Sequence, residues 1–318
     1  MARAAAIVKR LTLRLEARML GLALAIAVAL SLLSPYFLTT GNLLNLLDQS
    51  VVVGIVSIGM TFVILTGGID LSVGSVVGLT GVVLGLALQH FDIPTAIVCA
   101  IAAGALIGCI TGFLIAAFGL APFVVTLGVM AIGRSLAYIF SGQTSITNIP
   151  PDLNNIVYTS ILGVQSNVLT LLVLYLIAWL YLTYTKGGRT IYAVGSNREA
   201  ARTAGLNVLL YSVLPYVVSG ALAAVAATLL SAQILSVDPL AGNLLELDAI
   251  AAVVIGGASL YGGRGTIIGT LIGVFIMVMI RNGLNLMGVS PFWQGSAIGT
   301  IIIAAVLAER LLSGQARH

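Results

Sequence analysis

Long apolar runs, separated by short polar segments, fill most of this chain and leave few fold classes open to it. Only 8% of its 318 residues are charged, whereas 59% are hydrophobic, and the mean hydropathy is +1.14. A water-soluble domain carries roughly 25% charged residues, so this inventory cannot supply a surface that faces water on all sides. The sequence therefore predicts an all-α, polytopic membrane protein.

The apolar runs divide into about ten expected membrane spans within a single domain over residues 1–318. We expect these spans at Met19–Leu38, Val51–Leu65, Leu71–Gln89, Thr95–Phe118, Pro122–Phe140, Val168–Tyr184, Val213–Leu235, Glu246–Leu260, Thr266–Ile280 and Phe292–Ala308. Several have close to the lower limit of about 17 residues for a crossing helix. The longer connections expected outside the membrane are Thr39–Ser50, Ser141–Asn167 and Asn282–Pro291.

The distribution of charge orients these spans. Membrane proteins keep an excess of Lys and Arg in their cytoplasmic loops. Here the basic residues gather in residues 1–18, in the loop 185–212 and in the C-terminal tail, whereas the expected outer loops carry carboxylates, namely Asp48, Asp92, Asp152 and Asp238. Both termini and the loop 185–212 are therefore predicted to lie in the cytoplasm. Because the net charge of +4 is spread over short loops, it does not indicate nucleic-acid binding.

The basic segment Lys186–Tyr211 reads KGGRTIYAVGSNREAARTAGLNVLLY and lies between two apolar runs. Within it, Glu199–Gly205 should form a short helix, with Asn197 as its N-cap and a glycine to end it. Glu199 lies in the first turn, where a negative charge suits the helix dipole. Such a helix on a water-facing side offers a docking surface for another protein. The alternative is an ordinary basic cytoplasmic loop.

A second polar stretch, TGGIDLSVGS at residues 66–75, interrupts the apolar runs. Its glycines permit the backbone to leave the helix, and non-helical backbone at membrane depth persists only where protein buries it or where it lines a wet cavity. The alternative is that Asp70 only caps the following helix at the cytoplasmic surface. The residues that mark this stretch as a candidate gate are Gly67, Gly68, Asp70, Ser72 and Gly74.

The same glycine spacing occurs again near the C-terminus. The first copy is Gly67-Gly68, Gly74 and Gly78, and the second is Gly262-Gly263, Gly269 and Gly273. Both copies are expected at hairpins on the cytoplasmic side. Coincidence is the alternative in a chain with 36 glycines, but repeated, glycine-interrupted segments are what transporters use to frame a pathway.

Arg134 is the charged residue expected deepest in the membrane, roughly 20 Å along its helix at 1.5 Å per residue. An arginine at that depth either serves function and pairing or extends its guanidinium outward to the interface. Glu246 and Asp248 begin a span at similar depth and are its expected acidic partners. Arg281 lies nearer the outer surface, where we expect it to extend toward water.

Five motifs follow one another in order along the chain. They are IGMTFVILTGGIDLSVGS at 58–75, YAVGSN with EAA and a glycine at 192–205, ELDAIAAVVIGG at 246–257, GGRG at 262–265 and NGLNL at 282–286. Together they resemble the permease subunits of bacterial ABC sugar importers of the ribose, xylose, arabinose and galactose group, with ribose permeases most similar. The resemblance extends from about residue 40 to the C-terminus.

The residue patterns and this resemblance together give two groups of expected functional residues. The group expected to contact a partner ATPase is Gly195, Asn197, Glu199, Ala200, Ala201 and Gly205. The group expected to form the translocation pathway or its gate is Gly67, Gly68, Asp70, Ser72, Gly74, Arg134, Glu246, Asp248 and Asn282. The distance from Gly205 to Leu214-Pro215 is about two residues shorter than in the common EAA motif, which suggests a coupling helix presented differently from that of maltose-type permeases.

The resemblance also implies the partners of such a permease in the bacterial inner membrane. They are an ATPase subunit that binds ATP and Mg, a periplasmic or extracellular sugar-binding protein, a second permease copy (identical or paralogous) and membrane lipid. The chain lacks the phosphate-binding pattern G-x-x-x-x-G-K-[ST], so we predict a transport subunit without enzymatic activity, metal or cofactor of its own. The alternatives are a permease for nucleosides or branched-chain amino acids, and an ion-coupled secondary transporter with Asp70 or Asp248 as the coupling carboxylate.

Overall fold

The structure, a computed structural model, describes the backbone of residues 2–161, 163–290, 293–300, 303 and 307. Within these residues, seven helices contain a stretch long and apolar enough to cross a membrane. They are α1 (Ala2–Leu33), α2 (Thr40–Leu65), α4 (Ile93–Phe118), α5 (Pro122–Phe140), α7 (Ser166–Tyr184), α10 (Val208–Ile234) and α12 (Ile267–Leu286). The prediction of an all-α, multi-pass membrane protein is confirmed at this level.

Two of the expected spans are each about four residues shorter than predicted and too short to cross the membrane. The helix α3 (Val73–Ala87) has 15 residues and α11 (Leu245–Ile255) has 11, so they extend about 22 Å and 16 Å, against a hydrocarbon core of about 30 Å. Residues 66–72 are non-helical and delay the start of α3, and Gly257, with φ at +83°, follows the end of α11. The expected last span, Phe292–Ala308, lies partly outside the described residues, and 293–300 are helical.

Two segments predicted as external connections are helical instead. The helix α2 already begins at Thr40, and α12 continues through Asn282 to Leu286. Asn42 and Asn282 exchange two side-chain hydrogen bonds of 3.0 and 2.8 Å between these helices. Because each amide satisfies the other, both polar residues can be buried inside a helix bundle, which the sequence reading did not anticipate.

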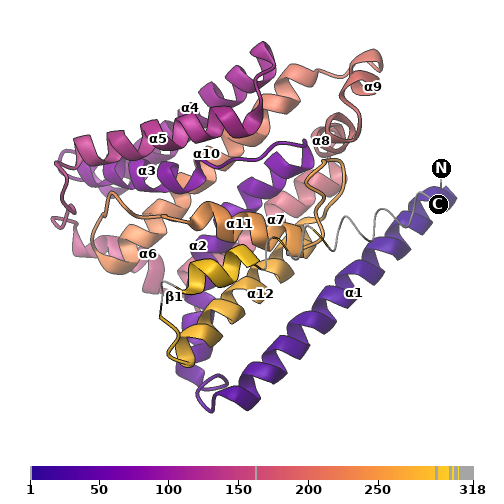
Figure 1. The fold of residues 1–318 in the computed structure, drawn as a ribbon. Coiled ribbons are helices and arrows are strands. Elements are labelled where there is room, and N and C mark those ends of the chain that lie inside the picture. Colours follow the sequence, from indigo (N-terminus) through magenta and orange to yellow (C-terminus); the bar gives the residue numbers. More distant parts are fainter. Residues whose placement is uncertain (1, 162, 291–292, 301–302, 304–306, 308–318) are drawn as a thin grey trace.

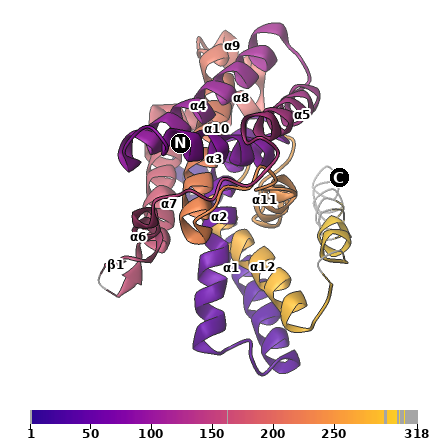
Figure 2. The ribbon, with the colours of Figure 1, turned by 90° about the vertical axis from the view of Figure 1, so that its left-hand side faces the viewer.

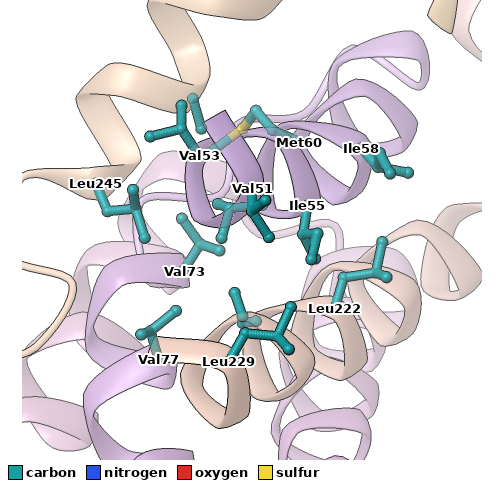
Figure 3. Packing of buried hydrophobic residues seen from close by; sticks show 14 of the residues in the cluster. Val51, Val53, Ile55, Ile58, Met60, Val73, Val77, Leu222, Leu229 and Leu245 are labelled. Carbon is teal, nitrogen blue, oxygen red and sulfur yellow. The ribbon is translucent and has the colours of Figure 1, made fainter. Parts of the chain in front are cut away.

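The core is built around α2, whose buried side chains face three other helices (Figure 3). Val73 and Val77 of α3, Leu222 of α10 and Leu245 of α11 approach it. Elsewhere α4 and α10 pack with almost no space between their backbones, because Gly104 of α4 lies directly against Gly220 of α10. Small residues at such crossings are how membrane helices associate.

The helix α10 connects two ends of the molecule that carry different elements (Figure 1). At its start lie α8 (Lys186–Ser196) and α9 (Arg198–Thr203), a region called here the α9 end. At its finish lie the 3₁₀ turn η1 (Pro151–Asn154) and α6 (Asn155–Tyr158), called the α6 end. The short strands β1 (Ser160–Ile161) and β2 (Val164–Gln165) pair in antiparallel fashion beyond α6.

The helix α1 lies along the outside of the bundle and contacts α12 (Figures 1 and 2). Only 6% of its stretch Glu16–Leu33 is buried. Its exposed side chains, such as Leu24 and Leu32, would face lipid in a membrane. This helix holds none of the predicted site residues, which all lie in the bundle or at the α9 end.

Candidate functional site: two glycine turns, a docking helix and buried charges

The predicted docking helix is present as α9, shifted by one or two residues from the expected Glu199–Gly205. The side-chain oxygen of Asn197 accepts a hydrogen bond of 2.9 Å from the Ala200 N–H, so the predicted N-cap is confirmed. Gly205 has φ at +76°, and the next residue, Leu206, bonds back to the Ala201 carbonyl at 3.1 Å. The helix therefore ends at a left-handed glycine, as expected. Its side chains Glu199 and Ala200 are exposed.

A second helix, α8, precedes it and was missed by the sequence analysis, which treated this part as loop. The Thr185 hydroxyl caps α8 by accepting from the Gly188 N–H at 3.0 Å. Ile191 and Val194, three residues apart, are buried and fix α8 against the bundle, while Ser196 at its end is exposed. The pair of apolar residues three positions apart, after a Thr-x-x-Gly cap, was the signal available in the sequence. Gly195, which was expected to contact the ATPase, faces the bundle instead, because a Cβ there would meet Leu65 and Gly263.

The two copies of the glycine repeat meet in space at the α9 end. We call residues 66–72 the first glycine turn and residues 256–266 the second. The Gly263 N–H donates a 2.9 Å hydrogen bond to the carbonyl of Leu65, the last residue of α2. A Cβ placed on Gly262 would lie 2.8 Å from the Gly67 nitrogen, so the two turns touch backbone to backbone.

The last turn of α8 lies against Leu65, the residue just before the first glycine turn, and against the second glycine turn. A Cβ on Gly195 would collide with the Leu65 carbonyl oxygen and lie 2.8 Å from the Gly263 nitrogen. The Tyr192 hydroxyl donates a 2.9 Å hydrogen bond to the Gly265 carbonyl. Burial raises the pKa of Tyr192 to about 12, further above neutral pH than the ordinary tyrosine value of about 10. The predicted docking segment is therefore joined directly to the predicted gate.

Asp70 lies within the first glycine turn and is buried, with 4% of its surface exposed. One carboxylate oxygen accepts from the Ser72 N–H at 3.0 Å and from the Ser72 hydroxyl, and the other accepts from the Ser219 hydroxyl of α10 at 2.8 Å. The N-cap of α3 is Ser72, with no side-chain cap bond, so Asp70 does not cap this helix as the alternative expected. Its buried carboxylate instead holds Ser72, the residue before α3, and links it to α10. Ser219 was not found from the sequence, because it lies 149 positions away.

Arg134 forms a different set of contacts from those expected. Its guanidinium donates hydrogen bonds of 2.7 and 3.0 Å to the carbonyls of Pro239 and Ala241, in the segment between α10 and α11. Gly74 and Gly78 of α3 leave room for that segment, since a Cβ on Gly78 would lie 2.9 Å from the Pro239 oxygen. Glu246 lies close to Gly74 beside the same segment. Arg134 therefore fixes the segment onto α3 and α5.

The predicted pairing of Arg134 with Asp248 is wrong. Asp248 forms an ion pair with Arg281 of α12 at 2.9 Å, the one ion pair found among the described residues. Arg281, which was expected to extend toward water, is the partner of Asp248 in place of Arg134. Asp248 is 5% exposed and Arg281 34% exposed, so the pair lies at the edge of the bundle's interior. The helices α11 and α12 pack side by side, which sequence spacing alone did not reveal.

The structure thus sorts the predicted pathway residues into three neighbourhoods. The first glycine turn carries Gly67, Gly68, Asp70 and Ser72; the Arg134 neighbourhood adds Gly74 and Glu246; and the α2–α11–α12 neighbourhood contains Asp248 and Asn282. Long spans surrounding short, glycine-broken helices with buried charges define a multi-pass membrane protein built like a transporter.

Comparison with known proteins gives the family. A model described as branched-chain amino acid transport system / permease component matches residues 42–306. The chain belongs to this family. Ribose import permease protein RbsC of Bacillus subtilis (strain 168) is 42% identical over 288 residues, covering 90% of this chain and 89% of that protein.

Two further relatives are similar over comparable lengths. Ribose import permease protein RbsC of Escherichia coli (strain K12) is 40% identical over 294 residues, covering 91% of this chain and 92% of its own. D-allose transport system permease protein AlsC of the same organism is 37% identical over 294 residues, covering 92% and 90%. No solved structure matches the chain.

Proposed function

We propose that this chain is the membrane permease subunit of an ABC importer that carries a monosaccharide, ribose or a closely related sugar, into the bacterial cell. The observation that carries the proposal is the identity of 42% and 40% to two ribose import permeases over about nine tenths of each chain. A relative at 37% is named for D-allose, so the sugar itself is the least constrained part. The family description names branched-chain amino acids, which makes these the second candidate substrate.

The permease works in the inner membrane with three kinds of partner. An ATPase subunit binds ATP and Mg on the cytoplasmic side, a sugar-binding protein delivers substrate on the other side, and a second permease copy completes the pathway. The charge pattern supports this orientation, because Lys186, Arg189, Arg198 and Arg202 all lie at the α9 end.

The helix α9 is the contact for the ATPase in this proposal. Glu199 and Ala200 are exposed, and nothing lies within 4 Å of a Cβ on Gly205, so this face is open. Small side chains allow a close fit in a groove. Closing of the ATPase on ATP moves α9, and the bundle changes the side from which its pathway is open.

Uptake in cells tests the substrate. The chain is expressed with its ATPase and binding protein in a bacterial strain lacking its own ribose permease, and uptake of labelled ribose is measured against excess unlabelled allose, xylose, adenosine or leucine. We expect saturable ribose uptake that excess sugar reduces. Uptake of leucine or adenosine in place of any sugar would contradict the sugar proposal while leaving the permease class intact.

The orientation has its own test. Single cysteines replace Asp152, at the α6 end, and Arg189, at the α9 end, in a chain that carries alanine at Cys99 and Cys109. Both positions are exposed, so each thiol is reachable from its own side. An impermeant thiol reagent added to intact spheroplasts should label the Asp152→Cys variant alone. Labelling of Arg189→Cys in intact spheroplasts would reverse the proposed orientation.

A further inference from the structure

We propose that Gly195 and Tyr192 of α8 are positioning residues that carry the movement of α9 to both glycine turns at once. The inference rests on the proposed function, since it takes α9 as the contact for the ATPase. It goes further by assigning transmission to α8, which the sequence did not show as a helix, and by naming the atoms through which the movement passes.

The connection from α9 to α8 is short and stiff. Asn197 is the single residue between the two helices, and it caps α9 while its own N–H bonds to the Ala193 carbonyl of α8 at 3.1 Å. Ile191 and Val194 hold α8 in the bundle. A displacement of α9 therefore reaches the last turn of α8 without a flexible linker to absorb it.

The last turn of α8 meets the bundle through backbone atoms. Gly195 lies against the Leu65 carbonyl and the Gly263 N–H, which are hydrogen-bonded to each other. Tyr192 adds a hydrogen bond to Gly265. Contacts between main chains leave no side-chain rotamer to yield, so the turns must follow α8 when it moves.

The two turns lead to the two short helices. The first glycine turn contains Asp70, whose carboxylate accepts hydrogen bonds from Ser72, just before α3, and from Ser219 of α10. The second glycine turn follows the end of α11. Both α3 and α11 adjoin the segment that Arg134 fixes. Through the two turns, α8 is thus connected to the start of α3 and to the end of α11. In the proposal these are the ends of the two helices nearest the ATPase.

The test separates hydrolysis from transport in the reconstituted complex of permease, ATPase and binding protein. Gly195→Ala adds one methyl group where the Leu65 carbonyl lies, and Tyr192→Phe removes one hydroxyl. Gly21→Ala in α1 is the matched control, because nothing lies within 4 Å of a Cβ there. All three variants should assemble, and stimulation of ATP hydrolysis by loaded binding protein should stay within about twofold of wild type. Uptake should fall about tenfold in Gly195→Ala and about threefold in Tyr192→Phe, while the control is unchanged.

Two outcomes overturn the inference. Wild-type uptake in Gly195→Ala would show that this contact packs the helix but transmits no movement. An equal loss of uptake and of stimulated ATP hydrolysis in an assembled complex would place the defect in docking of the ATPase. If Gly195→Ala fails to assemble, Tyr192→Phe decides, and wild-type uptake in that variant overturns the inference. Failure of the proposed function looks different: the wild-type complex would then show no ATP-dependent sugar uptake, whatever the variants do.

Discussion

The two ends of the short helices α3 and α11 are held by different kinds of contact. Toward the α9 end, main-chain atoms of α8 and the two glycine turns touch directly, as at Gly195 and Gly263. Toward the α6 end, charged side chains make the contacts, as in Arg134 with Pro239 and in Arg281 with Asp248. Main-chain contacts are short and stiff, whereas side-chain pairs can separate and re-form. In our account the first region transmits force and the second opens.

The largest expected effect comes from breaking the charged region at Asp248. Asp248→Ala leaves the Arg281 guanidinium without its carboxylate, which should lower the free energy of unfolding by about 3 kcal/mol. This is the low end for a buried pair, because Arg281 remains 34% exposed. Chemical unfolding of the purified permease in detergent measures the loss.

The double variant is the control for this prediction. Removing Arg281 as well, in Asp248→Ala/Arg281→Ala, should restore part of the stability, because no charge is then left unpaired. A double variant that loses the sum of both single losses would show that the pair does not act as one unit.

A smaller effect is expected at Arg134, in the same region. Arg134→Ala removes two charge-assisted hydrogen bonds to the segment between α10 and α11, at a cost of about 2 kcal/mol. Amide hydrogen exchange in residues 236–244 should accelerate, while exchange in α8 stays as in wild type. Arg134→Lys should be intermediate, since an ammonium group meets two carbonyls less well than a guanidinium fork. Unchanged amide hydrogen exchange in Arg134→Ala would show that Arg134 does not hold this segment in place.

The smallest effect concerns a charged side chain of the first glycine turn, Asp70. Ser219→Ala removes one of the hydrogen bonds to Asp70 but leaves those from Ser72, so the loss of stability should be about 1 kcal/mol. Thr228→Val is the control on the same helix, because that hydroxyl bonds the Ala224 carbonyl of α10 itself. Thermal unfolding of both variants in detergent compares them. Equal losses of stability in the two variants would show that the Asp70–Ser219 hydrogen bond contributes no more than a hydrogen bond within α10.

The sequence predicted the region toward the α9 end, where main-chain atoms make the contacts, better than it predicted the charged region. Asn197 and Gly205 predicted both ends of α9, because capping depends on neighbouring residues, and the repeated glycines pointed to the two turns that meet. The contact between those turns was not predictable, since it joins Leu65 to Gly263 across nearly 200 positions. The helix α8 was not predicted, because Gly187 and Gly188 near its start lower its helix propensity.

The charged region was predicted less well. Arg134, Glu246 and Asp248 were recognised as buried functional candidates, because charged residues in apolar runs are unusual. The expected pairing of Arg134 with Asp248 was wrong, since matching depth in a membrane does not say which helices are neighbours. The other expected partner, Glu246, does lie near Arg134, beside the same segment. The structure places α12 beside α11, so Asp248 forms its ion pair with Arg281. Arg134 donates its hydrogen bonds to main-chain carbonyls.

The central claim is that this chain couples ATP hydrolysis in a partner to sugar movement across the membrane. The most direct test measures both in the same proteoliposomes, which contain permease, ATPase and loaded binding protein, with ATP supplied on the side of α9. We predict labelled ribose uptake that requires ATP and stops with vanadate, in step with hydrolysis. Uptake that continues under vanadate and follows an imposed proton or sodium gradient would contradict the account and identify a secondary transporter.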